Sequence, residues 1–304
     1  MDFLRILEGL RTPWLTDFFL IITELGGETA FLALALIFFW CVDKRRGYYL
    51  MSVGFIGTMA NQFLKLWFRI PRPWVRDESF TAVEAAKGDA GGYSFPSGHT
   101  QTAVGTFGAI AATEKQRWLQ ITSIVLAVLV GFSRMYLGVH TPADVLVGGA
   151  MALILVLAVK PVIYKGGDKG MKILIAVMLA MAIAMVAFVE INPTELAADD
   201  VNYLSGMKNA YTMLGCLIGI AIVYPVERKA VCFTTDGIWW AQILKAVLGL
   251  AVVLAVKEGL RAPLEMLLPV YPARALRYFL IVLAAGLLWP MTFRFFAKLG
   301  RKNK

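Results

Sequence analysis

The chain has 304 residues but only two histidines, and each stands beside residues that could act with it in acid–base or nucleophilic chemistry. His99 closes the stretch Pro-Ser-Gly-His at 96–99, directly before an apolar segment. His140 precedes Asp144 by four residues, so the two side chains share a face if the segment is helical. A carboxylate bonded to one imidazole nitrogen fixes the tautomer and leaves the other nitrogen nucleophilic. His99 is then available as a general acid.

Three cationic residues, Lys65, Arg72 and Arg134, accompany these stretches. Cations clustered beside a membrane are costly unless something anionic lies among them, and arginine presents a planar fork of donors that matches phosphate oxygens. Ser97 and Gly98 lead into a helix N-terminus, where free backbone N–H groups favour an anion. Gly98 also allows close approach of the backbone. The set predicts phosphoryl transfer.

The composition indicates which elements must hold these residues. The chain is 59% hydrophobic and only 17% charged, and several apolar runs approach the ~20 residues that cross a bilayer. We therefore expect an all-α fold, a polytopic membrane bundle of about nine transmembrane helices. The expected spans are 28–42, 48–68, 98–113, 117–135, 142–160, 171–189, 207–224, 238–256 and 276–293.

Residues 2–24 repeat apolar side chains at helical spacing, but their uninterrupted apolar core is too short to span a bilayer. We expect an N-terminal amphipathic helix lying at the membrane interface. The span count also places the reactive stretches. Two crossings separate His99 from His140, and the stretch 65–73 follows the exit of span 48–68, so all three stretches should meet at one membrane face.

Loop charges predict which face this is. One side of the nine-span arrangement receives the basic loops around Lys44, Lys115 and Lys165 together with the basic C-terminal tail, and the other receives the acidic loop 190–200. The positive-inside rule makes the basic side cytoplasmic. The C-terminus is then cytoplasmic and the reactive stretches are extracytoplasmic, in a multi-pass protein of the cell membrane. The net charge of +9 has a topological origin on this interpretation, and we expect no nucleic-acid partner.

The three stretches resemble the signature of the type-2 phosphatidic acid phosphatase superfamily, which also includes vanadium haloperoxidases and glucose-6-phosphatase. Its pattern is K-x6-R-P, then P-S-G-H, then S-R-x5-H-x3-D. The matching residues are Lys65, Arg72-Pro73, Pro96-Ser97-Gly98-His99, Ser133-Arg134, His140 and Asp144. No residue departs from the pattern at these positions, and both histidines of the chain fall on the two required places.

The resemblance implies a role for each of these residues. His140 would attack phosphorus to form a phosphohistidine, Asp144 would orient it, and His99 would protonate the leaving oxygen. The phosphate oxygens would be held by Lys65, Arg72, Ser97, Gly98 and Arg134. The resemblance also implies no metal and no cofactor, and the sequence agrees, because no carboxylate cluster near the motifs offers magnesium ligands.

The resemblance covers about residues 10–160, so we expect a phosphatase core at 1–165 and additional transmembrane helices of unknown role at 166–304. The expected function is a metal-independent membrane phosphatase whose partners are membrane lipids and a lipid phosphate substrate. Phosphatidate, phosphatidylglycerol phosphate and polyprenyl diphosphate remain open as substrates, and so does the oligomeric state.

Two other functions fit the same residues. A phosphotransferase would pass the phosphohistidine to an alcohol instead of water, and product analysis with and without an acceptor distinguishes it from a hydrolase. A transporter or binding protein would use the cations as an anion site, and it has no need of a nucleophile paired with a carboxylate. A haloperoxidase is disfavoured, because soluble members usually carry that activity.

Overall fold

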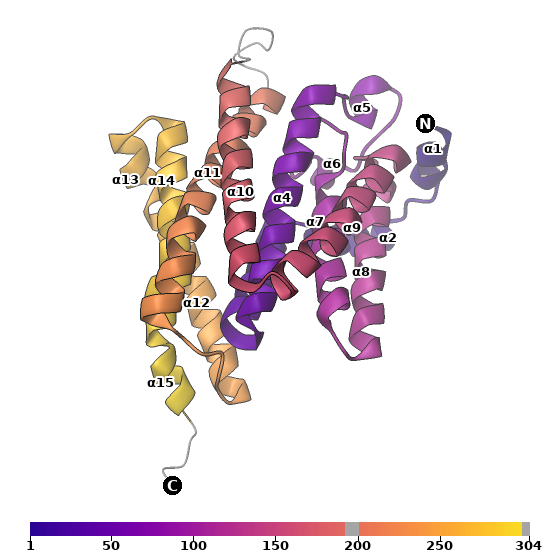
Figure 1. The fold of residues 1–304 in the computed structure, drawn as a ribbon. Helices are drawn as coiled ribbons and strands as arrows, with labels where there is room; N and C mark the ends of the chain where they lie inside the picture. Colours follow the sequence, from indigo (N-terminus) through magenta and orange to yellow (C-terminus); the bar gives the residue numbers. More distant parts are fainter. Residues whose placement is uncertain (192–200, 300–304) are drawn as a thin grey trace. The chain divides into compact units, whose positions relative to one another are not determined.

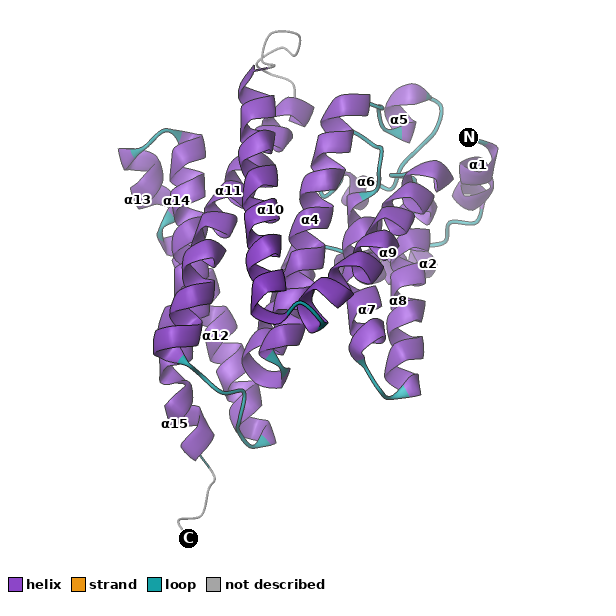
Figure 2. Cartoon of the chain, viewed as in Figure 1, coloured by secondary structure: helices purple, strands orange, loops and turns teal. Residues whose placement is uncertain are grey.

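The computed structural model describes residues 1–191 and 201–299, and these residues form helices joined by loops, with no strand among them (Figure 2). The all-α fold class is therefore confirmed. The chain divides into two compact units. The first unit comprises Met1–Leu32, Tyr49–Pro161 and residues 201–206, and it contains every residue of the predicted site. The second comprises Ala33–Tyr48, Val162–Ile191 and residues 207–299.

The predicted amphipathic segment forms two helices rather than one. Helix α1 covers Asp2–Gly9 and α2 covers Pro13–Glu24. Pro13 explains the break, because proline has no backbone N–H for a continuing helix but suits the first position of a new one. Helix α1 is amphipathic as expected: Leu4 and Leu7 are buried, whereas Phe3 and Ile6 are exposed.

Four longer helices carry the motifs in the first unit. Helix α4 (Lys44–Phe68) ends just after Lys65, α7 (Gly98–Thr113) begins inside Pro-Ser-Gly-His, α8 (Arg117–Tyr136) ends with Arg134, and α9 (Pro142–Tyr164) begins just after His140. The short helices α5 (Pro73–Arg76) and α6 (Glu84–Lys87) lie in the loop from α4 to α7. The motif residues thus lie at or next to helix ends, as the span count predicts. Figure 1 labels the four helices that carry them.

Glycines allow α7 to pack closely against its neighbours. A methyl group at Gly148 of α9 would lie 2.6 Å from the carbonyl oxygen of Ser97, and one at Gly57 of α4 would lie 2.0 Å from the Gln101 amide nitrogen. Both separations are shorter than real side-chain contacts. At Gly148 the neighbour is backbone, so a side chain has no room there, whereas at Gly57 the Gln101 amide would have to move. The sequence places glycine where α4 and α9 approach the start of α7.

An apolar cluster fixes the loop between α4 and α7. Ala82, Ala86 and Ala90 of the loop pack with Phe19 of α2 and Tyr136 of α8. The end of α8 is therefore held on one side by α2 and on the other by the loop. Burial of this cluster fixes the backbone that carries the second and third motifs.

The second unit contains the remaining helices. They are α3 (Glu28–Ile37), α10 (Gly167–Ile191), α11 (Val201–Val226), α12 (Trp239–Gly259), α13 (Arg261–Leu267), α14 (Val270–Leu283) and α15 (Phe293–Lys298). Helix α3 belongs to this unit only from residue 33, and α11 only from residue 207. Three π-helical turns, Phe38–Val42, Glu227–Val231 and Ala284–Leu288, adjoin α3, α11 and α14.

Each of the nine segments predicted as spans is helical in the structure. Within the described residues, six helices are long and apolar enough to cross a membrane, or seven if α2 and α3 form one bent span. The predicted count of about nine is therefore approximate. Helix α7 has only 16 residues, and α4 carries Lys44, Arg45, Arg46 and Lys65. Such helices reach membrane depth when other helices cover their polar groups.

Candidate active site

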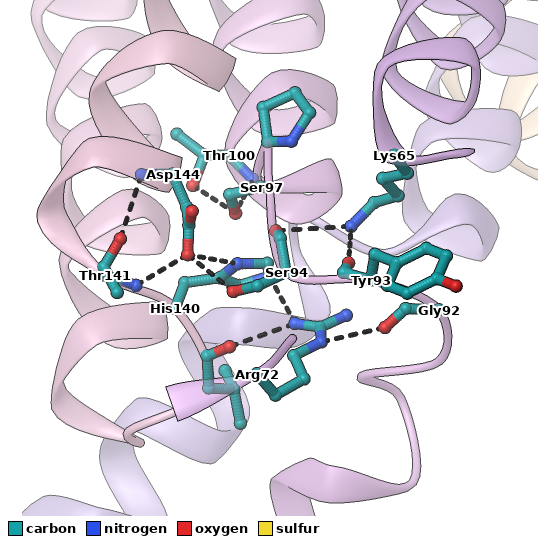
Figure 3. A network of polar contacts seen from close by, with 12 residues as sticks. Lys65, Arg72, Gly92, Tyr93, Ser94, Ser97, Thr100, His140, Thr141 and Asp144 are labelled. Carbon is teal, nitrogen blue, oxygen red and sulfur yellow. Dashed lines mark hydrogen bonds and ion pairs between the residues drawn. The ribbon is translucent and has the colours of Figure 1, made fainter. Parts of the chain in front are cut away.

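His140 and Asp144 face each other across the junction of α8 and α9. Nδ1 of His140 lies 3.4 Å from Oδ2 of Asp144, and both side chains are almost fully buried (Figure 3). The same carboxylate oxygen accepts hydrogen bonds from the backbone N–H of Thr141 at 2.8 Å and from Oγ of Ser94 at 2.6 Å. Three donors thus converge on one oxygen. This arrangement fixes the carboxylate, and through it the imidazole tautomer.

Arg72 occupies the other side of the His140 ring. Its Nη1 lies 2.8 Å from Nε2 of His140 and donates to the Val139 carbonyl at 3.0 Å. Its Nε donates to the carbonyl of Gly92 at 3.0 Å (Figure 3). Its Nη2 donates to the carbonyl of Gly91 at 3.1 Å. Since Nδ1 faces the carboxylate, Nε2 carries the lone pair that accepts from Arg72.

Lys65 reaches the same segment from α4. Its side chain is 4% exposed, and Nζ donates to the carbonyl oxygens of Tyr93 and Ser94. Together, Lys65 and Arg72 bind four consecutive carbonyls, those of residues 91–94. Carbonyl oxygens carry a partial negative charge. The four carbonyls therefore occupy the N–H donors of Lys65 and Arg72 to which phosphate oxygens would bind.

Arg134 is a cation of the site whose N–H groups are only partly used in hydrogen bonds. Its side chain is fully buried, and Nη1 donates to Oγ1 of Thr23 at 2.6 Å. Its Nε and Nη2 have no hydrogen-bond partner among the described residues. Its carbonyl accepts from the N–H groups of Val139 and His140, which ties the arginine to the nucleophile candidate. Buried guanidinium donors without partners indicate a place for an anion.

Ser97 is the N-cap of α7. Its Oγ accepts from the Thr100 N–H at 3.4 Å and lies 2.8 Å from Oγ1 of Thr100, while its own N–H donates to the Asp144 carbonyl at 2.9 Å. The hydroxyl predicted to bind phosphate is therefore engaged in capping. A methyl group at Gly98 would meet only Oδ1 of Asn61, at 3.7 Å, so the first turn of α7 has open space beside it.

His99 differs from His140 in the burial and the hydrogen bonding of its ring. Its side chain is only partly buried and makes no hydrogen bond to the residues that the structure describes. Lys65, Arg72 and Arg134 lie close enough to both imidazoles to act on them electrostatically, and the two rings also interact with each other. The structure therefore brings both histidines and all three cations of the predicted site together.

Burial and charge determine the protonation of His140. Burial lowers the pKa of its imidazole well below the ordinary value, and the positive charges of Arg72, Lys65 and Arg134 lower it further. Burial also lowers the pKa of Arg72, to about 10, which leaves the guanidinium charged at neutral pH. The His140 ring is therefore neutral at neutral pH, the form that a nucleophile needs.

Several residues of the site were not predicted. Ser94 bonds Asp144, and Thr23 bonds Arg134, although neither belongs to a predicted set. Gly26 is required by packing, because a methyl group there would lie 2.8 Å from the His99 carbonyl. Asn61 had a usable signal, because it precedes Lys65 by four residues and therefore shares its helical face. Thr23 and Gly26 had none, because their contacts depend on the fold.

A buried imidazole–carboxylate pair thus lies beside three cations, in a chain whose helices include six or seven that are long and apolar enough to cross a membrane. The sequence-family model of the PAP2 superfamily matches residues 45–168. A second family model, described as PAP2 superfamily phosphatase, transmembrane extension, matches residues 211–302. Of the additional helices, those within residues 211–302 thus match a known extension. The division at 165/166 stays a prediction.

Curated relatives are similar to the first half of the chain. Phosphatidylglycerophosphatase B of Bacillus subtilis (strain 168) is 32% identical over 164 residues, which cover 50% of this chain and 76% of that protein. Undecaprenyl-diphosphatase BcrC of the same organism is 32% identical over 40% of this chain and 63% of its own. Lipid A 4′-phosphatase of Porphyromonas gingivalis is 28% identical, over 49% and 66%.

A solved structure matches as well, the crystal structure of the first transmembrane PAP2 type phosphatidylglycerolphosphate phosphatase from Bacillus subtilis. It is 30% identical and covers 52% of this chain and 81% of its own, with a TM-score of 0.44. By its sequence matches, the chain belongs to the PAP2 superfamily. The predicted class, a membrane phosphatase of that superfamily, is confirmed.

Proposed function

We propose that this phosphatase hydrolyses a lipid phosphate or diphosphate through a covalent phosphohistidine at His140, without a metal ion. The observation that carries the proposal is the orientation of one ring. Nδ1 of His140 faces the Asp144 carboxylate, and Nε2 points to the guanidinium of Arg72. A neutral imidazole held this way directs its lone pair toward the cationic side chains, which would bind the phosphate group.

The reaction has two steps. In the first, Nε2 of His140 attacks phosphorus, the bond from phosphorus to the lipid oxygen breaks, and protonated His99 gives its proton to that oxygen. In the second, water attacks phosphorus, the phosphorus–nitrogen bond breaks, and neutral His99 takes a proton from the water. The products are inorganic phosphate and the lipid alcohol, or inorganic phosphate and the lipid monophosphate when the substrate is a diphosphate.

The cations hold the phosphate in both steps. The free N–H donors of Arg134 and the first backbone N–H groups of α7 bind non-bridging oxygens. At Lys65 and Arg72, phosphate oxygens take the place of the carbonyls of residues 91–94, and Arg72 thereby leaves Nε2 of His140. These fixed positive charges stabilise the transition-state charge that a metal ion stabilises in other phosphatases.

The substrate belongs to lipids whose phosphate lies at the membrane surface. Candidates are phosphatidate, phosphatidylglycerol phosphate and polyprenyl diphosphate, and the names of the relatives include a phosphatidylglycerophosphatase and an undecaprenyl-diphosphatase. Helix α1 supports an interfacial site. Its exposed Phe3 and Ile6 suit the bilayer surface, and its Arg5 bonds Asp77 of the α4–α7 loop at 2.8 Å.

We place the site on the extracytoplasmic face and the C-terminus in the cytoplasm. The loop charges support this assignment, because the basic loops lie on the side opposite the site in the span count. Five basic residues on the side of the site are exceptions to the rule: Lys65, Arg69, Arg72, Arg76 and Arg134. Three of them, Lys65, Arg72 and Arg134, are buried in the candidate site rather than exposed in a loop.

The test is a panel of lipid phosphates and diphosphates with the purified full chain in EDTA. We expect phosphate release from at least one of them, unchanged by the chelator, and none from His140→Ala. The ranking of the panel identifies the substrate. Activity that returns only with a divalent cation, or full activity of His140→Ala, would contradict the proposed mechanism.

A further inference from the structure

Helices α4 and α7 enclose a row of buried polar side chains that the proposed chemistry does not use. Ser52 and Asn61 belong to α4, and Gln101 and Thr106 belong to α7. Each of the four is at most 3% exposed. Each also has one polar atom without a hydrogen-bond partner among the described residues: Ser52 Oγ, Asn61 Oδ1, Gln101 Nε2 and Thr106 Oγ1. We call this set the polar row.

The packing register shows that the polar row follows a single interface. A methyl group at Gly98 would meet Asn61, one at Gly57 would meet Gln101, and one at Gly105 would meet Val53. Residue numbers thus fall along α4 as they rise along α7, so the two helices are antiparallel. By the same register, Ser52 and Thr106 come at one level, beyond that of Gln101. The polar row therefore leads away from the N-terminus of α7.

The unpartnered atoms are complementary in type. Oδ1 of Asn61 is an acceptor without a donor, and Nε2 of Gln101 is a donor without an acceptor. Gln101 lies opposite Gly57, which is about one turn of α4 from Asn61. Hydroxyls of Ser52 and Thr106 both donate and accept. None of the four is charged, so an ion has no counter-charge here. Water is the ligand that donates and accepts at once, and buried waters typically make about three hydrogen bonds to such groups.

The polar row begins at the phosphate site. Asn61 stands four residues before Lys65, and its Nδ2 donates to the Pro96 carbonyl at 3.4 Å. Its free Oδ1 is the atom that lies beside Gly98, next to His99. A water bound to Oδ1 would thus lie near Gly98, which directly precedes the residue that must activate water in the second step. Polar groups buried in membrane helices commonly mark such pathways.

We propose that the polar row holds a line of water molecules that delivers the hydrolytic water to the phosphohistidine. This inference rests on the proposed function, because it concerns the second of its two steps. It gives Asn61 and Gln101 a water-binding role. Loss of the row should slow release of inorganic phosphate and spare release of the lipid alcohol.

The test uses Gln101→Leu in the purified full chain, because this side chain makes no hydrogen bond to a motif residue. With phosphatidate, rapid quenching measures diacylglycerol, enzyme-bound phosphate and free phosphate separately. We expect a normal burst of diacylglycerol, free-phosphate formation slowed about tenfold, and accumulation of phosphoenzyme. With ethanol present, the share of ethyl phosphate should rise.

Two further variants separate water delivery from folding. Thr106→Val keeps the shape of its side chain and removes one hydroxyl of the row, so it should slow the second step as well. Thr113→Val is the matched control on the same helix, because its hydroxyl is already bonded to the carbonyls of Ala109 and Ile110. We expect it to behave as the natural protein does.

The outcomes are distinct. If both steps slow equally in Gln101→Leu and Thr106→Val, or if neither slows, the water line is wrong, while the phosphohistidine can still stand. Absence of any phosphoenzyme in the natural chain and in both variants would instead count against the proposed function itself.

Discussion

Asp144 shows how much of the site depends on one atom. Its Oδ2 accepts from Ser94 and Thr141 and faces Nδ1 of His140, so the carboxylate cannot rotate without losing two hydrogen bonds. Of these three donors, Thr141 donates from its backbone and His140 belongs to the predicted site. Ser94 donates from a neutral side chain that was not predicted. In the proposed mechanism, Ser94 is a positioning residue that acts through Asp144.

Replacing Ser94 by alanine should therefore lower kcat and leave KM nearly unchanged. The hydrogen bond ends on a carboxylate, and its loss should reduce kcat by about tenfold. Ser123→Ala is a matched control, because Ser123 is also buried but lies on α8 away from the motifs. Steady-state kinetics on phosphatidate would detect the change. An increase in KM with unchanged kcat would mean that Ser94 serves binding instead.

The protonation of His140 can be measured directly, because the chain has only two histidines. Burial and the neighbouring cations lower its pKa, so the ring should stay neutral as the pH falls through about 6.5, the ordinary histidine value. It should take up its proton only at lower pH. NMR of 15N-histidine-labelled protein would show this, with His99→Gln for assignment. Titration of His140 at or above 6.5 would contradict the geometry.

At the scale of the elements, close packing of α7 depends on particular glycines. A methyl group at Gly148 would lie 2.6 Å from the Ser97 carbonyl, whereas one at the next residue, Gly149, would have no neighbour closer than 3.7 Å. Gly148 belongs to α9, which begins at Pro142, two residues after His140. Its small size therefore lets α9 reach the backbone of the second motif.

Gly148→Ala should move the N-terminus of α7 and lower both activity and stability. Overpacking of this kind costs about 1–3 kcal/mol, and it acts on the residues that we propose bind the phosphate. Gly149→Ala is the matched control and should keep activity. Thermal unfolding and kcat of the two variants would be compared. Equal behaviour of the pair would show that the Ser97 contact does not matter.

Much of the element scale could be predicted from sequence, because helix length and apolar runs leave strong patterns. Each of the nine expected segments is helical, and motif residues lie at helix ends as expected. The split of the first helix at Pro13 was missed, although proline at a helix start is a known signal. Contacts of Thr23, Gly26 and Ser94 could not be predicted, because a sequence pattern contains no distances. The same is true of Arg72, whose contact with Nε2 of His140 depends on the loop 91–94.

At the scale of the whole molecule, the sidedness of the membrane decides where the substrate is met. The chain offers a natural probe. Of its three cysteines, Cys216 is buried, Cys41 is partly buried and Cys232 is exposed, in the segment that joins α11 to α12. The expected topology places this segment in the cytoplasm, opposite to the proposed active site.

An impermeant maleimide should therefore label Cys232 only after the membrane is permeabilised. Cells that express the full chain would be treated intact or permeabilised, and labelling would be read on the purified protein. Cys232→Ser should abolish the signal and confirm its source. Labelling of Cys232 in intact cells would reverse the orientation and place the site in the cytoplasm.

The central claim is that His140 carries the phosphoryl group during the reaction. The most direct measurement is to quench the protein during turnover of labelled phosphatidate, under conditions that preserve phosphohistidine, and to locate the phosphoryl group by mass spectrometry. We expect it on His140 in the natural chain and on no residue in His140→Ala. A phosphoryl group on another residue, or turnover by His140→Ala at the natural rate, would contradict the account.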